Sequence, residues 1–212
     1  MSKTSAHQTL TYGQVNSILK LFKIPEELTP EFVKRQFNTI SRLAHIISQL
    51  SYESANFTRL SENMNYSATR LRQVFPSRVT VQQAQALAHK PREIANHLYG
   101  GRFGNNKDND GWIYRGRSPL MITFKDNYRQ MEEITGIPFV ENPELMETME
   151  YGMVASLAWL ESRNINQVIA KPPTNYETVK AVTKVINGGY NGLDQRESLF
   201  HLTLNKIRKI IP

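Results

Sequence analysis

Apolar residues spaced three and four apart, punctuated by proline and glycine, constrain the fold of this chain more than any other sequence feature. The clearest run follows Thr29, where a hydroxyl residue, a proline and a glutamate in succession predict the start of a helix. Its apolar positions keep the period of a helix, and they are Val33, Phe37, Ile40, Ala44, Ile47 and Leu50. Runs of this kind predict packed helices and not a sheet.

The same punctuation predicts further helices. They are a segment capped by Thr80 that stops near Pro91, residues 91–99, residues 125–135, an element opened at residues 142–144 that carries Met149, Met153, Leu157 and Leu160, a helix after a capping box at residues 174–177, and a last helix capped by Asp194. Residues 103–123 lack a helical period, and residues 112–115 within them are a candidate short strand. We therefore expect one mainly α-helical domain.

Composition excludes several classes of protein. The chain has no cysteine, which excludes disulfides, a thiolate nucleophile and a cysteine-ligated zinc ion. Neither a membrane-spanning apolar run nor the apolar core of a secretory signal is visible, so we expect a protein made in a cytoplasm. Lysine and arginine number 26 against 19 acidic residues, and the resulting net charge of +7 favours a polyanionic partner.

Three polar segments could carry chemistry. Glu53 ends the strongly apolar helical run, which is a sheltered place for a carboxyl group that must hold a proton for general-acid catalysis. Glu62 lies among the amide and hydroxyl side chains of residues 61–67, and residues 111–123 combine aromatic and basic side chains. Paired carboxylates with such neighbours suit glycoside cleavage. The spacing alone also fits two solvated charges and a structural turn.

Five motifs, in order, resemble glycoside hydrolase family 19, the chitinase-like family, and in particular its phage endolysin branch. They are residues 52–57, 61–67, 114–117 followed by 127–128, 186–189 and 192–196; residues 96–99 and 102–105 also resemble that branch. The resemblance covers about residues 30–211 and implies a mainly α, lysozyme-like fold with a cleft between two lobes. It implies a single catalytic domain over residues 1–212, with no separate wall-binding domain, that hydrolyses a β-1,4 glycan with inversion and without a metal or cofactor.

The resemblance assigns roles position by position. Glu53 matches the general acid of the family, Glu62 the general base, and Thr123 a hydroxyl residue that helps to hold the attacking water. The positions that match substrate-binding residues are Tyr52, Tyr66, Arg117, Met121, Asn127, Asn187 and Arg196.

Four positions depart from the family pattern. Tyr52 stands where the family has histidine, Ser118 opens an altered run, and Phe124 replaces the glycine of endolysins. Met121 replaces a glutamine that contacts substrate in the family, and its thioether can only pack or accept weakly. These departures bear on specificity and turnover more than on the type of reaction.

The sequence thus predicts a monomeric endolysin, a muramidase-like glycosidase whose substrate is the glycan strands of bacterial peptidoglycan. The family implies synthesis in the host cytoplasm and action on the wall in the periplasm, after a separate membrane-permeabilising protein, a holin, has opened the way. Three alternatives stay open: a lytic transglycosylase, which needs only one glutamate, a chitinase, and a catalytically impaired glycan-binding protein.

Nucleic-acid binding and metal sites are disfavoured. Basic residues are scattered, and no helix-turn-helix, zinc or RNA-binding pattern is present. Residues 106–111 resemble the start of a calcium loop, but Arg117 stands where the bidentate glutamate should be. The histidines match no metal-binding pattern and are interpreted as packing or surface residues; they are His7, His45, His89, His97 and His201.

Overall fold

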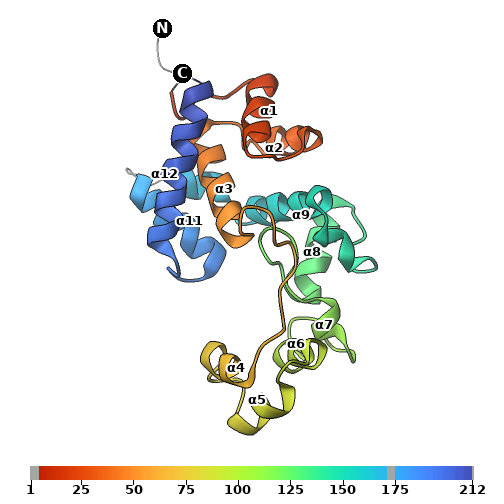
Figure 1. The fold of residues 1–212 in the computed structure, drawn as a ribbon. Coiled ribbons are helices and arrows are strands. Elements are labelled where there is room, and N and C mark those ends of the chain that lie inside the picture. Colours follow the sequence, from red (N-terminus) through yellow and green to blue (C-terminus); the bar gives the residue numbers. More distant parts are fainter. Residues whose placement is uncertain (1–4, 171–174, 212) are drawn as a thin grey trace.

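A computed structural model describes residues 5–170 and 175–211, and it confirms the mainly α-helical fold (Figure 1). The elements in chain order are α1 (Tyr12–Leu21), the 3₁₀ turn η1 (Glu26–Leu28), α2 (Thr29–Lys34), α3 (Ile40–Glu53), α4 (Ala68–Val74), α5 (Val81–Leu87), α6 (Pro91–Tyr99), α7 (Asp110–Ile113), α8 (Lys125–Thr135), the 3₁₀ turn η2 (Pro143–Glu147), α9 (Met149–Ser162), α10 (Ile165–Ala170), α11 (Asn175–Asn187) and α12 (Leu193–Ile210). Within the described residues there is no β-strand, and none of the helices is long and apolar enough to cross a membrane.

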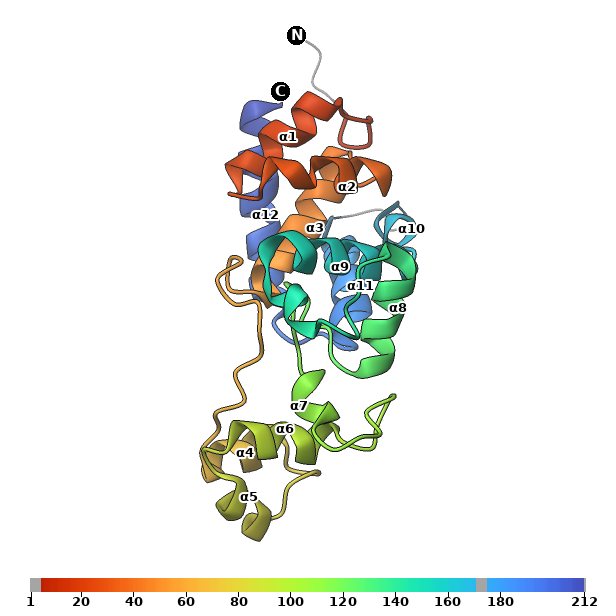
Figure 2. The ribbon, with the colours of Figure 1, turned by 90° about the vertical axis from the view of Figure 1, so that its right-hand side faces the viewer.

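The helices form two lobes, and the buried apolar side chains of the described residues form three clusters, one of them in the smaller lobe. The larger lobe packs α3 against α12 and buries Phe32, Leu43 and Phe200 among other side chains. The smaller lobe, α4 to α6, has its own core around Leu71 and Ile94. Figures 1 and 2 show the smaller lobe and α7 set apart from the other helices and joined to them by two chain segments. These inter-lobe segments, residues 54–67 and 114–124, carry half of the ten predicted site residues.

The apolar run that starts at Thr29 forms two helices, so the prediction of one continuous helix is wrong. α2 ends at Lys34, and Gln36 adopts a left-handed backbone with φ of 58°. An α-helix cannot contain that conformation. Thr39 then caps α3, because its side chain accepts a hydrogen bond of 3.2 Å from the backbone N–H of Arg42.

The element expected after Asn142 is also divided. The proline at position 143 opens only the 3₁₀ turn η2. The helix that carries the predicted methionine and leucine stripe is α9, and its cap is Thr148, whose side chain accepts from the N–H of Tyr151 at 3.2 Å. The prediction is therefore right that the methionine and leucine stripe lies on one helix, but wrong about where that helix begins.

Other helix boundaries are mostly as predicted. The helices over residues 91–99 and 125–135 are confirmed, and α8 ends at Gly136 with φ of 74°. Thr80 caps α5, whereas the capping box proposed at residues 174–177 begins outside the described residues. Asp194 lies in the first turn of α12 and does not cap it, because Gly192 is the N-cap. The strand proposed at residues 112–115 is wrong, since its first half belongs to the short helix α7.

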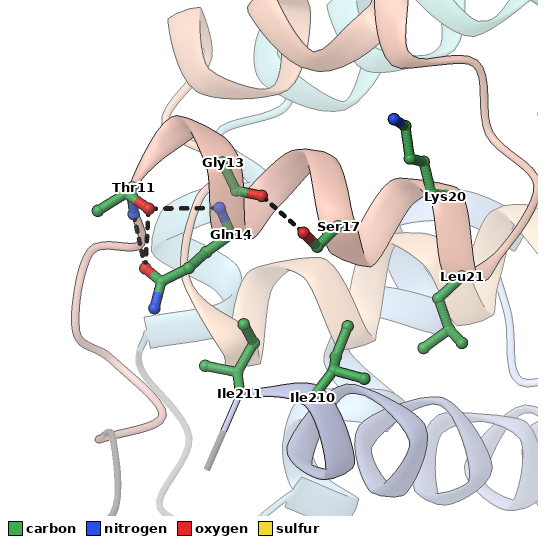
Figure 3. Close-up of a pocket in the computed structure, with 8 residues that line it drawn as sticks. All are labelled: Thr11, Gly13, Gln14, Ser17, Lys20, Leu21, Ile210 and Ile211. Atoms are coloured by element: carbon green, nitrogen blue, oxygen red, sulfur yellow. Dashed lines mark hydrogen bonds between the residues drawn. The ribbon is translucent and has the colours of Figure 1, made fainter.

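α1, which the sequence analysis did not identify, packs beside the end of α12. Thr11 and Gln14 form a reciprocal capping box, in which the N–H of Thr11 donates to the Gln14 amide oxygen at 2.9 Å. A groove of about 1040 Å³ lies here. Figure 3 shows its lining residues, from Thr11 and α1 on one side and Ile210 and Ile211 on the other. This groove lies at the opposite end of α12 from Arg196.

Candidate active site

Glu53 is the last residue of α3, and its carboxylate meets the first turn of α12. Arg196, only 2% exposed, donates to Glu53 through Nη2 and to the Gln49 side-chain oxygen through Nη1 at 2.5 Å. Its Nε donates to the carbonyl of Asn191 at 3.0 Å. The planar guanidinium therefore ties the end of α3 to the start of α12 and fixes the orientation of the Glu53 carboxyl.

Tyr52 lies beside this ion pair. The guanidinium carbon of Arg196 lies 4.1 Å from the centroid of the Tyr52 ring, which is a cation–π contact. The Tyr52 hydroxyl occupies the space beside Gly192, where any Cβ would collide with it. Gly192 also has φ of 70°, a conformation that favours glycine. The tyrosine at position 52 is thus accommodated by a glycine in the neighbouring turn.

Glu62 lies on the first inter-lobe segment and is held by hydrogen bonds from two other parts of the chain. The hydroxyl of Tyr99, at the end of α6, lies 2.8 and 3.0 Å from the two carboxyl oxygens of Glu62 and donates to them. The N–H of Gly116 donates to the same carboxyl at 3.3 Å, and the Glu62 N–H donates to the Gly116 carbonyl at 2.8 Å. Glu62 is therefore fixed to the smaller lobe and to the second inter-lobe segment.

Burial governs the electrostatics of this carboxyl. It raises the pKa of Glu62 above its ordinary value, while the hydrogen bonds from Tyr99 and Gly116 and the charge of Arg115 act in the opposite direction and only partly offset it. The pKa of the Tyr99 hydroxyl is raised too, first by burial and then by Glu62, so this hydroxyl stays a donor. Burial, and next Glu62, also raise the pKa of Tyr66. Shifted groups of this kind are typical of catalytic sites.

Thr123 lies beside the same glycine as Glu62. A Cβ added to Gly116 would lie 3.1 Å from Glu62 Oε2 and 3.3 Å from Thr123 Oγ1. The Thr123 hydroxyl donates to the Met121 carbonyl at 3.0 Å, and Asn127 donates to the Thr123 carbonyl at 2.7 Å. Glu62 Oε2 and Thr123 Oγ1 therefore both lie beside Gly116, so that the carboxyl and the hydroxyl are neighbours at this glycine.

Glu147 is a third carboxylate, one that sequence reasoning missed. Its Oε1 accepts from Arg117 Nε at 2.5 Å, from Arg115 Nη2 at 2.9 Å and from the Ser61 hydroxyl at 3.2 Å. Arg117 is 5% exposed and also donates to the Tyr128 hydroxyl at 3.0 Å. The guanidinium of Arg117, predicted to bind substrate, is engaged within the protein, and Glu147 holds the two inter-lobe segments together.

The structure brings the residues expected from sequence into two groups. One group is Tyr52, Glu53 and Arg196, where α3 meets α12; the other is Glu62, Thr123, Met121 and Asn127, where the inter-lobe segments meet. Tyr66 packs its ring edge-on against Phe75 in the smaller lobe, with ring centroids 5.7 Å apart. Asn187 is exposed at the last position of α11.

Tyr99, Gln49 and Glu147 complete the two groups, although the sequence did not assign them a role. Gln49 lies one helical turn before Glu53, so the spacing of four residues was a signal that it shares that face of α3. Tyr99 ends the motif at residues 96–99, which resembles the phage branch. No comparable signal preceded Glu147.

The loop that resembles a calcium site is internally satisfied. The carboxyl of Asp110 accepts from the Lys107 N–H at 3.1 Å and lies 3.5 Å from Lys125 Nζ. In the part of the chain that the structure describes, no group of three or more histidine, aspartate or glutamate side chains is placed to hold a metal ion.

Known proteins resemble the chain in sequence and in fold. No model of a known protein family matches it. A glycosyl hydrolase family 19 domain-containing protein of Haemophilus influenzae is 32% identical over 163 residues, which cover 74% of this chain and 76% of the relative. A crystal structure of a chitinase C mutant shares the fold with a TM-score of 0.56 and 16% identity over 96% of this chain and 95% of that chain. Chitinase C from Streptomyces griseus HUT6037 gives 0.53 and 16%, over 93% and 92%.

The helical, lysozyme-like fold and the family 19 relative together define a glycoside hydrolase. In particular, the chain belongs to glycosyl hydrolase family 19, as its five motifs predicted. Hydrolysis of glycans by a family 19 chitinase-like fold is therefore established as its general activity. The phage branch and the roles of single residues stay predictions.

Proposed function

We propose that this glycoside hydrolase is a phage-type endolysin that cleaves the β-1,4 bonds of bacterial peptidoglycan with inversion. The observation that carries the proposal is that the Glu62 carboxyl and the Thr123 hydroxyl lie side by side at Gly116. An inverting enzyme needs a base that can take a proton from its attacking water, and a second carboxyl that acts as the acid on the opposite face of the sugar.

The proposed reaction divides the work between the two lobes. Glu53 donates its proton to the glycosidic oxygen as the bond to the anomeric carbon breaks, and Glu62 takes a proton from the water that attacks the opposite face. Thr123 orients that water. Inverting carboxyls stand roughly 6.5–9.5 Å apart, and Glu62 lies nine residues after Glu53 on an extended segment outside α3, which is compatible with such a gap.

Arg196 and Tyr99 act as positioning residues in this scheme. Arg196 fixes the acid through its contact with Glu53, and Tyr99 fixes the base through its hydrogen bonds to Glu62. Both are buried, so neither side chain has another conformation readily open to it. Substrate would therefore meet two carboxyls already set in place.

The net charge of +7 and the phage-like motifs at residues 96–99 and 102–105 favour a peptidoglycan substrate. Bacterial envelopes are polyanionic, and a positively charged enzyme concentrates on them. In this proposal the monomeric enzyme is made in the host cytoplasm, depends on a holin for release, and acts on the wall in the periplasm.

The test compares purified peptidoglycan and chitin as substrates, together with the turbidity of permeabilised Gram-negative cells. We expect the wild-type protein to clear the cells and solubilise peptidoglycan, and Glu53→Gln to do neither. Cleavage of chitin alone would assign the protein to the chitinases. A lack of hydrolysis on both substrates, with binding retained, would favour the impaired glycan-binding alternative.

NMR of the freshly formed product tests the mechanism separately. A reducing end of inverted configuration supports the proposal, and a retained one contradicts it. A 1,6-anhydro sugar would identify a lytic transglycosylase, for which Glu62 would not be needed as a base.

A further inference from the structure

A second groove, of about 600 Å³, begins at the loop that follows Glu53. It runs between the end of α1, the loop after α3, the start of α9 and α12; its walls include Phe22, Lys23, Asn56, Phe57, Met149 and Lys206. We infer that this groove binds the carboxylates of the stem peptide that peptidoglycan carries on its glycan strand. The inference rests on the proposed function, which it deepens by naming the part of the substrate that the groove recognises.

The charge of the groove favours an anionic occupant. None of the described residues that line it is an aspartate or glutamate. Lys23 and Lys206 are exposed at its rim, and in residues 5–170 and 175–211 neither forms an ion pair with an acidic side chain. Lys206 Nζ lies 5.8 Å from the centroid of the Phe22 ring. Two ammonium groups beside apolar walls are therefore free to meet carboxylates.

The walls also suit a short peptide. Phe22, Phe57 and Met149 offer apolar surface for alkyl side chains, and they are partly buried against the core of the larger lobe. Asn56 and Thr58 add amide and hydroxyl groups for the peptide backbone. A chitin strand carries no carboxylates, so the two lysines would have no partner on it.

The position of the groove connects it to the catalytic residues. Ser51 and Asn56, which line it, lie two residues before and three residues after Glu53. An α-helix has 3.6 residues per turn, so Ser51 faces away from Glu53, and it is the loop after Glu53 that leads around the end of α3 from the acid to the groove wall at Asn56. A stem peptide branches directly from the glycan, and a strand held at Glu53 would bring its peptide to this region.

The loop after Glu53, which forms one wall of the groove, has a fixed shape. Ala55, Asn56 and Phe57 are three successive non-glycine residues with left-handed backbone, at φ of 50°, 57° and 63°. Such residues are uncommon and persist where the surroundings hold them. Here the Asn56 N–H donates to the Ser51 carbonyl at 2.7 Å, and the Phe57 N–H donates to the Ser54 hydroxyl at 2.9 Å. The wall is therefore preformed and does not need to order when a ligand binds.

The experiment compares kcat/KM on glycan strands with stem peptides and on the same strands after an amidase has removed them. The groove variant is Lys23→Met combined with Lys206→Met. The control combines Lys34→Met with Lys209→Met, which removes two exposed lysines that do not line the groove. We expect the wild type to favour the peptide-bearing strand by about three- to tenfold, the size of effect that two solvent-exposed charge pairs supply. The groove variant should lose this preference and the control should keep it, with activity on bare strands unchanged in both.

Three results would overturn the inference: no preference in the wild type, equal loss of preference in both double variants, or equal loss by the groove variant on both substrates. An NMR titration of ¹⁵N-labelled wild-type protein with the tripeptide L-Ala-γ-D-Glu-meso-diaminopimelate decides it independently of activity. Chemical shift changes at the groove residues support the inference, and their absence contradicts it. If the wild type cleaves neither strand, the proposed function is wrong, and the titration still tests the groove.

Discussion

Removing the hydroxyl of Tyr99 tests how the smaller lobe controls the proposed base. Tyr99 is 8% exposed, and its ring packs edge-on against Phe124 with centroids 5.4 Å apart. Tyr99→Phe keeps this packing and deletes only the donor that lies 2.8 and 3.0 Å from the two Glu62 oxygens. That hydrogen bond lowers the pKa of Glu62 against the effect of burial, so its loss raises the pKa of this carboxyl further.

The size of the effect follows from the charge of the acceptor. A hydrogen bond to an ionised group contributes about 1.5–3 kcal/mol, and about 1.4 kcal/mol is a factor of ten. We therefore expect kcat/KM of Tyr99→Phe to fall by roughly ten- to a hundredfold on the acidic side of the profile. A general base works when ionised, so the acidic limb should move to higher pH while the rate at alkaline pH approaches that of the wild type.

Stability should change with pH in the corresponding sense. The pKa of Glu62 is higher in the folded than in the unfolded chain, so the folded state holds its proton over a wider pH range. The stability that this proton contributes to the folded state is fully present below the ordinary glutamate pKa of about 4.3. It is lost as the pH rises through the higher pKa that Glu62 has in the folded state. Tyr99→Phe raises the pKa of Glu62 further, so ionising this carboxyl at neutral pH costs the folded variant more than the wild type. The variant should therefore be less stable than the wild type at neutral pH and nearly as stable near pH 4, where the carboxyl is protonated in both.

The assay is a pH profile of kcat/KM, with urea unfolding at two pH values. Tyr114→Phe is the matched control, because it also loses one buried hydroxyl, which donates to the Val140 carbonyl at 3.0 Å and not to a carboxyl. Its acidic limb should not move. An equal fall in the rate of Tyr99→Phe at every pH, with its acidic limb unmoved, would refute the role given to this hydroxyl.

Five further substitutions test the rest of the site. Glu53→Gln should lower glycan hydrolysis by about 10²–10⁴-fold with the circular dichroism spectrum unchanged; activity within a few-fold of wild type would contradict its role as acid. The rate losses caused by Glu62→Gln and Thr123→Ala should not be additive in free energy, so the double variant should be about as slow as Glu62→Gln in single-turnover assays. Losses that multiply would show that the two residues act independently. Met121→Gln should preserve or raise oligosaccharide affinity in calorimetry, because an amide can bond to a sugar; weaker binding with a lower melting temperature would show that this subsite has been rebuilt. Glu147→Gln deprives the buried Arg117 of its counter-charge and should cost about 1–3 kcal/mol in urea unfolding, and an unchanged midpoint would show that the ion pair is dispensable.

Helices with chemical stop signals could be predicted closely from the sequence. α6 lies between Pro91 and Gly100, and α8 ends at Gly136, because proline and glycine fix the backbone locally. The break between α2 and α3 could not be read in the same way, since the left-handed residue there is Gln36, which has no sequence signature for that conformation. α1 has a capping box at Thr11 and could have been found from it.

The two groups of the site were predictable to different degrees. Glu53 and Glu62 lie in motifs that the family resemblance marks, so each could be named from sequence. Their partners depend on how the lobes meet: the contact from Tyr99 to Glu62 spans 37 residues and that from Ser61 to Glu147 spans 86. No local pattern encodes contacts over such separations.

The separate core of the smaller lobe has a consequence for how the enzyme fails. That core contains few buried side chains, among them Leu71, Ile94 and Tyr99, whereas the larger lobe buries many more. Cooperative units with less buried surface open at lower free energy than the rest of a protein. Local opening of α4 to α6 would release Tyr99 from Glu62 while α3 and α12 stay packed. We therefore expect inactivation by heat to be a subglobal event that precedes global melting, with the amide hydrogens of the smaller lobe exchanging with solvent first.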